Sequence, residues 1–346
     1  MLKRFIGAAA AAFMALAASL PAQAQQEPEV TLRIHQFLPA QAFIPKDFIV
    51  PWAEKIEQES NGRIKFEHYP SMQLGGSPPS LYDQVREGVV DIVWTLPGYT
   101  PGRFPKAEAF ELPFLVTTAE ASSAAFWDFY EKHLQDEFAD VKVLAVHNHG
   151  PGLIHTKGKA VRTLEDMRGM KLRGPTRTVT SLLERLGATA VGMPVPAVPE
   201  SLSKGVIDGA VIPWEVTVPL KVPELTDYHT VFAGDRGLYT SSFVFAMNQE
   251  AYDRLPDDLK KVIDDNSGRV ASAWAGRVMD QGDVIGLELA QQTDNEIITI
   301  GEEEKQRWVE AAEPVVQAWI EEMNSQGFNG EELVNDARAL IEQHTN

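Results

Sequence analysis

The same order of secondary-structure elements occurs twice in this sequence, and this repetition limits the possible folds more than any other feature. Alternating apolar and polar residues predict strands, and apolar residues at helical spacing predict the helices between them. In the first half these are the strands 30–37, 63–70 and 91–97 and the helices 48–61 and 80–88. In the second half they are the strands 170–173, 189–195 and 208–214 and the helices 176–187 and 199–205. Such alternation is typical of parallel sheets covered by helices, so the sequence predicts two α/β domains side by side.

A longer helical segment is expected between Pro256 and Gln292. Apolar residues recur there at spacings of three, four and seven, which indicates one long helix, or two helices with a kink near Gly282. Such a helix is long enough to lie across both domains. Because no linker separates the halves, we expect the chain to cross between the domains more than once. The expected domains are 27–148 plus about 241–280, and 149–240 plus about 281–346.

The first 24 residues have the three parts of a secretory signal peptide. Lys3 and Arg4 precede an apolar run from Phe5 to Leu20, and small residues lead to Ala24. We therefore expect cleavage after Ala24 and export to the periplasm. No later stretch is long and apolar enough to span a membrane.

The composition excludes several classes of function. The chain has no cysteine, so it can form neither disulfide bonds nor a thiol active site. Its net charge of −18 opposes nucleic acid as a partner. An anionic ligand would need a local positive site.

Arg173 is the candidate for that site. It ends an expected strand, and in open α/β sheets ligands lie outside the carboxyl ends of strands. The turn at 176–178 opens a helix, whose N-terminal amides favour anions. The planar guanidinium matches a carboxylate through two parallel hydrogen bonds. The alternative is a structural ion pair with one of the 49 acidic residues, which position alone does not exclude.

Six stretches of this chain occur in an order and at a spacing that resemble one family. They are GRIKFEHYPSMQLGG, LYDQVREGVVDIVW, FELPFL, GMKLRGP, SLSKGVIDGAV and LPDDLKKVIDD, within a match from about Ile34 to Ala275. The family comprises the substrate-binding proteins of tripartite ATP-independent periplasmic (TRAP) transporters, the DctP family. The resemblance implies two α/β domains that close around a ligand as a Venus flytrap, with a long helix spanning both. It also implies that Arg173 grips the carboxylate of an organic acid and that the membrane subunits of a TRAP transporter are partners.

The chemical nature of the acid is indicated by the residues near Arg173. Some sugar-acid binders of the family carry a second arginine before this segment, but here Leu153 and Ile154 stand there, with His155 the nearest basic residue. Aromatic residues in segments expected to face the cleft favour an apolar ligand body, although each could instead belong to the core. They are Phe37, Phe43, Trp94, Trp214, Tyr239 and Phe243. The preferred interpretation is an aromatic or hydrophobic monocarboxylate, and the alternatives are a C4-dicarboxylate, a keto acid or a sugar acid.

Three rival interpretations are weaker. His147 and His149 stand two apart, as on one face of a strand, and could begin a metal site, but no further ligand follows at a recognisable spacing. We therefore expect one of them to bond in the cleft, and neither metal nor cofactor. The usual nucleophile and nucleotide motifs are absent from the sequence, so an enzyme is not expected. An ABC-type binding protein would share the architecture, and only the motifs argue against it.

Overall fold

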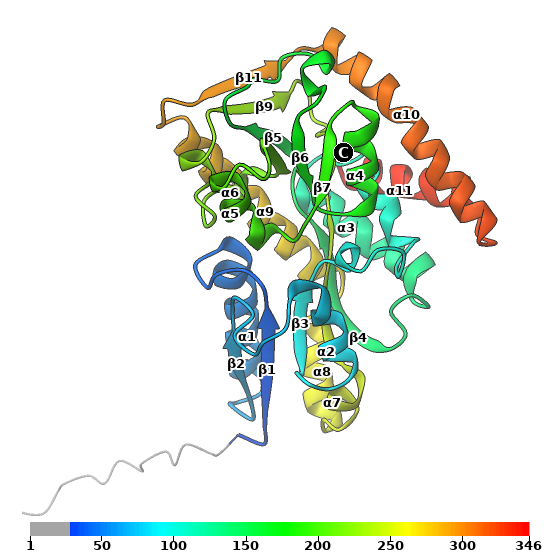
Figure 1. Ribbon diagram of the computed structural model, residues 1–346. Helices are drawn as coiled ribbons and strands as arrows, with labels where there is room; N and C mark the ends of the chain where they lie inside the picture. Colours follow the sequence, from blue (N-terminus) through cyan, green and yellow to red (C-terminus); the bar gives the residue numbers. More distant parts are fainter. Residues whose placement is uncertain (1–27, 346) are drawn as a thin grey trace, which may run out of the picture.

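The computed structural model describes residues 28–345, and the predicted signal peptide lies outside them. These residues form two β-sheets, one in the lower and one in the upper part of the molecule in Figure 1. The strand order is β2-β1-β3-β10-β4 in the first sheet and β11-β9-β5-β8-β6-β7 in the second. The predicted two-domain α/β fold is therefore confirmed. Within the described part of the chain, no helix combines the length and apolar character needed to cross a bilayer.

The six predicted strands lie close to their predicted positions, and residues 28–345 form five further strands that were not predicted. The first sheet contains β1 Val30–Gln36, β2 Ile64–Tyr69, β3 Ile92–Thr95, β4 Val141–Asn148 and β10 Ser242–Asn248. The second contains β5 Leu153–Thr156, β6 Lys171–Gly174, β7 Thr189–Gly192, β8 Gly209–Ile212, β9 Tyr228–Phe232 and β11 Glu296–Ile300. The α-helices are α1 Val50–Glu59, α2 Leu81–Arg86, α3 Ala119–Phe129, α4 Arg177–Arg185, α5 Val198–Ser203, α6 Trp214–Thr217, α7 Gln249–Asp253, α8 Asp257–Asp265, α9 Arg269–Ala290, α10 Glu302–Ser325 and α11 Gly330–Thr345.

The sheets are mixed, and the prediction of parallel sheets is wrong for one strand in each. β10 runs antiparallel to β3 and β4, and β5 runs antiparallel to β8 and β9. The cause is the crossing of the chain between the sheets, from β4 to β5 and back from β9 to β10. A strand that arrives from the other domain enters its new sheet at the carboxyl edge, so it runs against its neighbours.

The predicted helix between Pro256 and Gln292 is two helices, and the break is not at Gly282. α8 ends at Asn266, whose side-chain amide donates to the carbonyl of Val262 at 2.8 Å. Gly268 then has a φ of +81°, which favours glycine, and its amide donates to the carbonyl of Leu144 at 2.7 Å. Gly282 lies inside α9 and serves close packing instead, because a Cβ there would approach Phe43 to 2.9 Å.

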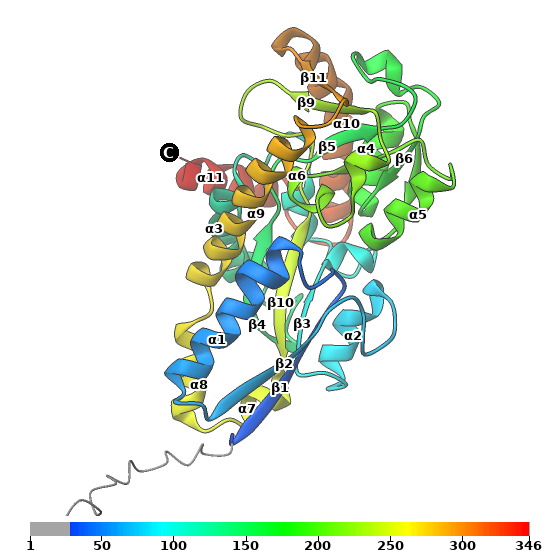
Figure 2. The ribbon, with the colours of Figure 1, turned by 90° about the vertical axis from the view of Figure 1, so that its left-hand side faces the viewer.

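Helix α9 spans both domains. It packs against α3 and β4 of the first and against α6 of the second, and Figure 2 shows it running from one sheet towards the other. Asp280 accepts hydrogen bonds from the amides of Ala119 and Glu120 at the start of α3, at 2.7 and 2.9 Å. Asp283, less than one turn later, accepts from the amide of Glu215 in α6 at 2.8 Å. One helix is thereby bonded to both domains.

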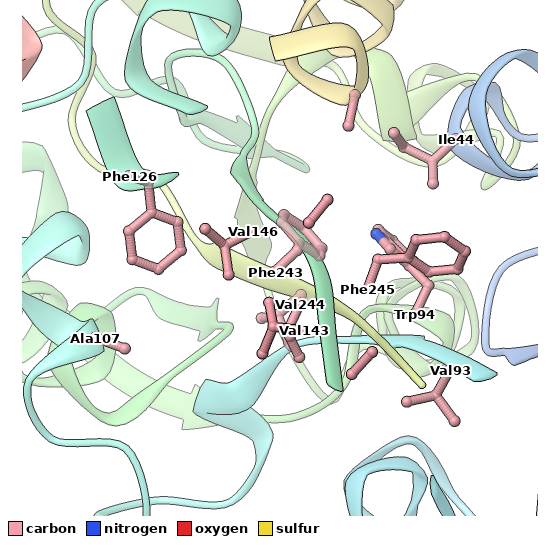
Figure 3. Close-up of a cluster of buried hydrophobic side chains, with 14 of the residues drawn as sticks. Ile44, Val93, Trp94, Ala107, Phe126, Val143, Val146, Phe243, Val244 and Phe245 are labelled. Atoms are coloured by element: carbon pink, nitrogen blue, oxygen red, sulfur yellow. The ribbon is translucent and has the colours of Figure 1, made fainter. Parts of the chain in front are cut away.

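Strand β10 forms the centre of the first core. All seven of its residues are buried. Figure 3 shows its Phe243 and Phe245 near Trp94 of β3 and Val146 of β4. Trp52 of α1 packs edge-on against Phe245, with 4.8 Å between ring centroids.

The predicted domain segments match the membership of the sheets. All strands of the first sheet fall in 27–148 and 241–280, and all strands of the second fall in 149–240 and 281–346. The last helix, α11, packs against α3, and Thr345 there bonds to Thr117 at 2.8 Å. We propose the predicted division for the sheets and assign α11 to the first domain.

Candidate ligand-binding site

A pocket lies where the two sheets face each other, and its volume is about 350 Å³ with open solvent included. Segments that follow the carboxyl ends of strands from both sheets line it, as expected for open α/β sheets. From the first domain come Phe37, Leu38, Trp94, Leu96 and Tyr99. From the second come Arg173, Pro175, Val195, Ile212, Pro213, Glu215 and Val216. His149, Tyr239 and Ser241 belong to the segments that cross between the sheets, and Phe243 belongs to the start of β10.

Arg173 reaches the pocket from the end of β6. Strand β6 stops there because Thr176 caps α4, its hydroxyl accepting from the amide of Val179 at 3.5 Å. The guanidinium donates to the carbonyl of Met193 through Nε at 2.9 Å and to the carbonyl of Val211 through Nη1 at 3.2 Å. These bonds fix its plane and leave further N–H groups for a ligand.

The charge of Arg173 has no counter-ion among residues 28–345. Arg173 is only 2% exposed, and no acidic side chain of residues 28–345 lies within ion-pair distance of its guanidinium. Burying an unpaired cation is costly, so such a group calls for an anionic partner. The structural ion pair considered from the sequence is not observed.

Two buried phenols flank the guanidinium. Tyr239 donates to the carbonyl of Val211 at 2.8 Å, and the hydroxyl of Tyr99 accepts from the amide of Val195 at 2.9 Å. Burial raises the pKa of both tyrosines, and the charge of Arg173 opposes this shift only in part. Both phenols are therefore neutral near pH 7 and do not compensate the arginine charge.

Aromatic rings form one wall of the pocket. Phe243 stacks on Trp94 with ring centroids 4.8 Å apart and planes within 9°, and on His147 at 4.8 Å and 6°. Trp94 donates to Nε2 of His147 at 2.7 Å, which holds these two rings nearly coplanar. Phe37 also stacks on Trp94, with ring centroids 4.8 Å apart and planes 30° apart. The stacked rings form a wall that is apolar, because the indole N–H of Trp94 is already bonded to His147.

Both histidines of the HNHG stretch have their ring nitrogens in use. Besides the bond to Trp94, His147 faces its neighbour's carbonyl through Nδ1 at 3.4 Å. His149 donates from Nδ1 to the carbonyl of Gly150 at 2.6 Å and accepts from the amide of Ser241 at Nε2. Burial lowers the pKa of each histidine to about 3. They are neutral, and no group of metal-ligating side chains occurs in the described residues.

The structure brings six of the predicted residues to the pocket and places three outside its lining. Phe37, Trp94, His149, Arg173, Tyr239 and Phe243 line it. Phe43 packs on α9 at Gly282. Trp214 and His155 form a separate cluster with His229, in which the two histidine Nδ1 atoms are 2.7 Å apart. Trp214 packs with Ala290 of α9, and its backbone lies against Gly286, where a Cβ would clash.

The sequence interpretation missed three polar lining residues: Ser241, which precedes β10, and Tyr99 and Glu215, which follow strand ends. Tyr99 follows β3 in a short 3-10 helix, Pro97–Tyr99, and Glu215 follows β8. The rule that led to Arg173, the search at carboxyl ends of strands, applies equally to them. At the end of β8 the sequence predicted Trp214, whereas the lining residue is Glu215, one position later.

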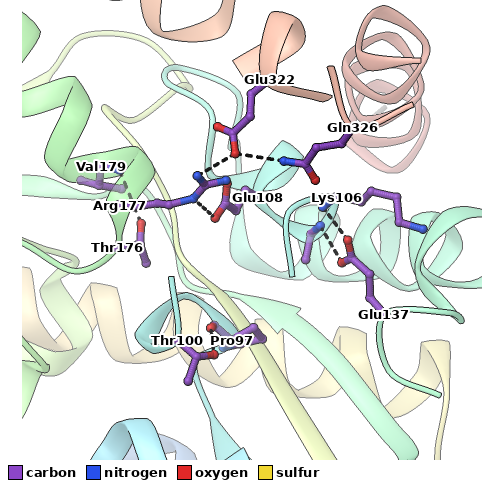
Figure 4. A network of polar contacts seen from close by, with 11 residues as sticks. Pro97, Thr100, Lys106, Glu108, Glu137, Thr176, Arg177, Val179, Glu322 and Gln326 are labelled. Carbon is purple, nitrogen blue, oxygen red and sulfur yellow. Dashed lines mark hydrogen bonds and ion pairs between the residues drawn. The ribbon is translucent and has the colours of Figure 1, made fainter. Parts of the chain in front are cut away.

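An ion-pair network lies beside the cleft and joins the domains. Arg177 of α4 binds both carboxylate oxygens of Glu108 at 2.6 Å and reaches Glu322 of α10 at 2.8 Å, as Figure 4 shows. Glu108 belongs to a short helix of the first domain, Ala107–Glu111. This network holds the two domains in a closed arrangement.

Comparisons with known proteins agree with this geometry. A TRAP solute-binding protein from Rhodoferax ferrireducens T118, solved with copurified benzoate, is 52% identical, with a TM-score of 0.90 over 91% of this chain and 98% of that one. A marine-metagenome TRAP solute-binding protein, solved with 3-hydroxybenzoate, is 49% identical, with a TM-score of 0.91 over 92% and 100%. One from Bordetella bronchiseptica, with bound (R)- and (S)-mandelate, is 31% identical, with a TM-score of 0.85 over 91% and 99%. The model of bacterial extracellular solute-binding protein, family 7, matches residues 35–322. The chain therefore belongs to this family of solute-binding proteins, in agreement with the TRAP-transporter motifs of its sequence.

Proposed function

We propose that the protein captures an aromatic monocarboxylate in the periplasm and delivers it to the membrane subunits of a TRAP transporter. The carboxylate binds Arg173, and the ring lies against the wall of Phe37, Trp94 and Phe243. The observation that carries the proposal is the buried guanidinium of Arg173, which lacks a counter-ion among the described residues and faces an apolar pocket.

The lining favours a monocarboxylate over the other acids considered. Arg173 is the only cationic side chain of the lining, since His149 is neutral, so a second carboxylate would be buried without a positive partner. Ten of the sixteen lining residues are apolar, and each buried hydroxyl of a sugar acid would need a partner of its own. An aromatic ring needs only flat apolar contacts, which the stacked wall provides.

Three related structures support this ligand class. The relatives bind benzoate, 3-hydroxybenzoate and mandelate, all of which combine one carboxylate with one aromatic ring. They share the fold of this chain over nearly its full length. The membrane partners are inferred from the family, whose members serve TRAP transporters.

Ligand capture requires the domains to separate. Phe37, Arg173 and Tyr239 are 3%, 2% and 1% exposed, so a ligand cannot reach them in the closed arrangement described above. Opening would break the interdomain contacts of Arg177, and closure would bury the ligand. The equilibrium between these states is what a ligand shifts.

The site favours binding without chemistry. His149 is the only lining histidine, and both of its nitrogens are hydrogen-bonded to the backbone, so it is not available as a general base. We therefore propose that the ligand leaves unchanged. The family assignment argues against an ABC-type binding protein.

Isothermal titration of the mature protein tests the proposal. After dialysis to remove copurified ligand, benzoate and mandelate should bind one to one, with succinate, pyruvate and galactonate at least about tenfold weaker. Mass spectrometry of the released ligand should show it unaltered. Tight binding of succinate or galactonate with no response to any aromatic acid would refute the proposed ligand class.

A further inference from the structure

Glu215 is a pocket residue with a carboxyl oxygen that is unsatisfied within the described part of the chain. The residue is 3% exposed, and its Oε2 atom is buried without a hydrogen bond among residues 28–345. No Lys, Arg or His of those residues forms an ion pair with it. Because a buried polar group without a partner is costly, the position calls for a ligand group.

The direction of Glu215 is fixed by α9. Its amide donates to Asp283 at 2.8 Å, and its Cβ packs against Gly282, where any side chain would approach it to 2.7 Å. The backbone and Cβ of Glu215 are thereby positioned against α9, and the residue is part of the pocket lining. Glu215 follows β8, which is the neighbour of β6, and Arg173 is the last residue but one of β6, so both groups line the same end of the second sheet.

The setting of Glu215 favours the neutral form of its carboxyl group. Burial raises its pKa well above the ordinary value, and the nearby Asp283 raises it further. A neutral carboxyl group offers one O–H donor and one carbonyl acceptor. A hydroxyl group can satisfy both, since it donates and accepts at once. An apolar substituent would leave both unmet.

We propose that Glu215 is a specificity-determining residue that hydrogen-bonds a hydroxyl group of the ligand, so that hydroxylated aromatic monocarboxylates are preferred over the unsubstituted acids. This inference rests on the proposed function and refines its substrate class. Arg173 binds the carboxylate, the aromatic wall contacts the ring, and Glu215 hydrogen-bonds the hydroxyl substituent.

The test compares benzoate with its 2-, 3- and 4-hydroxy derivatives and with mandelate by calorimetry. The wild-type protein should bind at least one hydroxylated acid about tenfold to hundredfold more tightly than benzoate. In Glu215→Leu this ratio should fall towards one, whereas Glu215→Gln, which keeps a donor and an acceptor, should retain most of it. Glu224→Leu, at an exposed acid on the same segment outside the pocket, should keep the wild-type ratio.

The outcomes separate this inference from the proposed function. Tight benzoate binding with no hydroxyl preference in the wild type, or an unchanged ratio in both Glu215 variants, would overturn the role of Glu215 and leave aromatic-acid binding in place. Failure of the wild type to bind any of these acids would overturn both. Melting curves of the ligand-free variants verify that each is folded. If the leucine variant is not stable, the wild-type preference for a hydroxylated acid over benzoate remains the deciding measurement, and its absence would overturn the inference.

Discussion

Replacement of Arg173 gives the most direct test of the site. Its guanidinium is almost fully buried, so a carboxylate bound to it is fully desolvated. Truncation to alanine would leave that charge without a partner, which costs about 2–5 kcal/mol, or roughly 30-fold to several thousand-fold in affinity. Arg173→Lys keeps the charge, but an ammonium cannot form the planar fork, so we expect a loss of about tenfold to hundredfold.

The effect on stability should be small by comparison. Alanine removes the bonds to the carbonyls of Met193 and Val211, but Tyr239 still donates to Val211 at 2.8 Å. It also removes a buried cation that has no counter-ion among the described residues, and these changes oppose each other.

The assay is calorimetric titration with benzoate, combined with melting curves of the ligand-free variants. Arg162→Ala is the control, because Arg162 forms only an exposed pair with Glu296 in the same domain and should leave the affinity unchanged. Wild-type affinity in Arg173→Ala would refute the carboxylate-binding role. A large drop in ligand-free melting temperature with binding retained would show that Arg173 is structural instead.

Three further outcomes are expected. Small-angle scattering should show a smaller radius of gyration with saturating benzoate than without ligand, and an unchanged radius would contradict domain closure. Phe243→Ala should lower the free energy of unfolding by about 3–5 kcal/mol in denaturant titrations, since the ring is buried against Trp94 and His147; a loss below about 1 kcal/mol would contradict this packing. Burial raises the pKa of Glu111 from 4.5 to about 8, so the folded state holds a proton that the unfolded state releases, and this group costs stability as the pH rises from 4.5 to 8. In Glu111→Gln the melting temperature should therefore fall less between pH 5 and 8 than in the wild type, and an equal fall would show that Glu111 is ionised in the folded protein.

The sequence predicted features that depend on local patterns. Strand alternation, helical spacing and the position of Arg173 at the end of a strand all follow from neighbouring residues. The direction of β5 and β10 did not follow, because it depends on where the chain crosses between sheets. The helix break at Gly268 could not be predicted either, because a single residue with a positive φ angle does not change the spacing of apolar residues along the sequence.

The site was predictable in part for the same reason. Arg173 and the aromatic residues that follow strand ends could be named from sequence. The choice between Trp214 and Glu215 could not, because it depends on packing against α9, which is distant in sequence: the backbone of Trp214 lies against Gly286, and its side chain clusters with Ala290. Local reasoning identifies which segment reaches a pocket, and tertiary packing decides which residue of that segment faces it.

The two aspartates of α9 determine how this molecule can open. Asp280 is bonded to the first domain and Asp283 to the second, and they are three residues apart, or about 4.5 Å along the helix axis. If both sets of bonds persist, the domains can only rotate about this point, which acts as a fulcrum. Displacements are then smallest beside α9 and increase with distance from it. Interdomain contacts away from α9, such as that of Arg177 with Glu108, are therefore displaced most when the domains rotate. Small changes in the strength of these contacts shift the balance between open and closed forms.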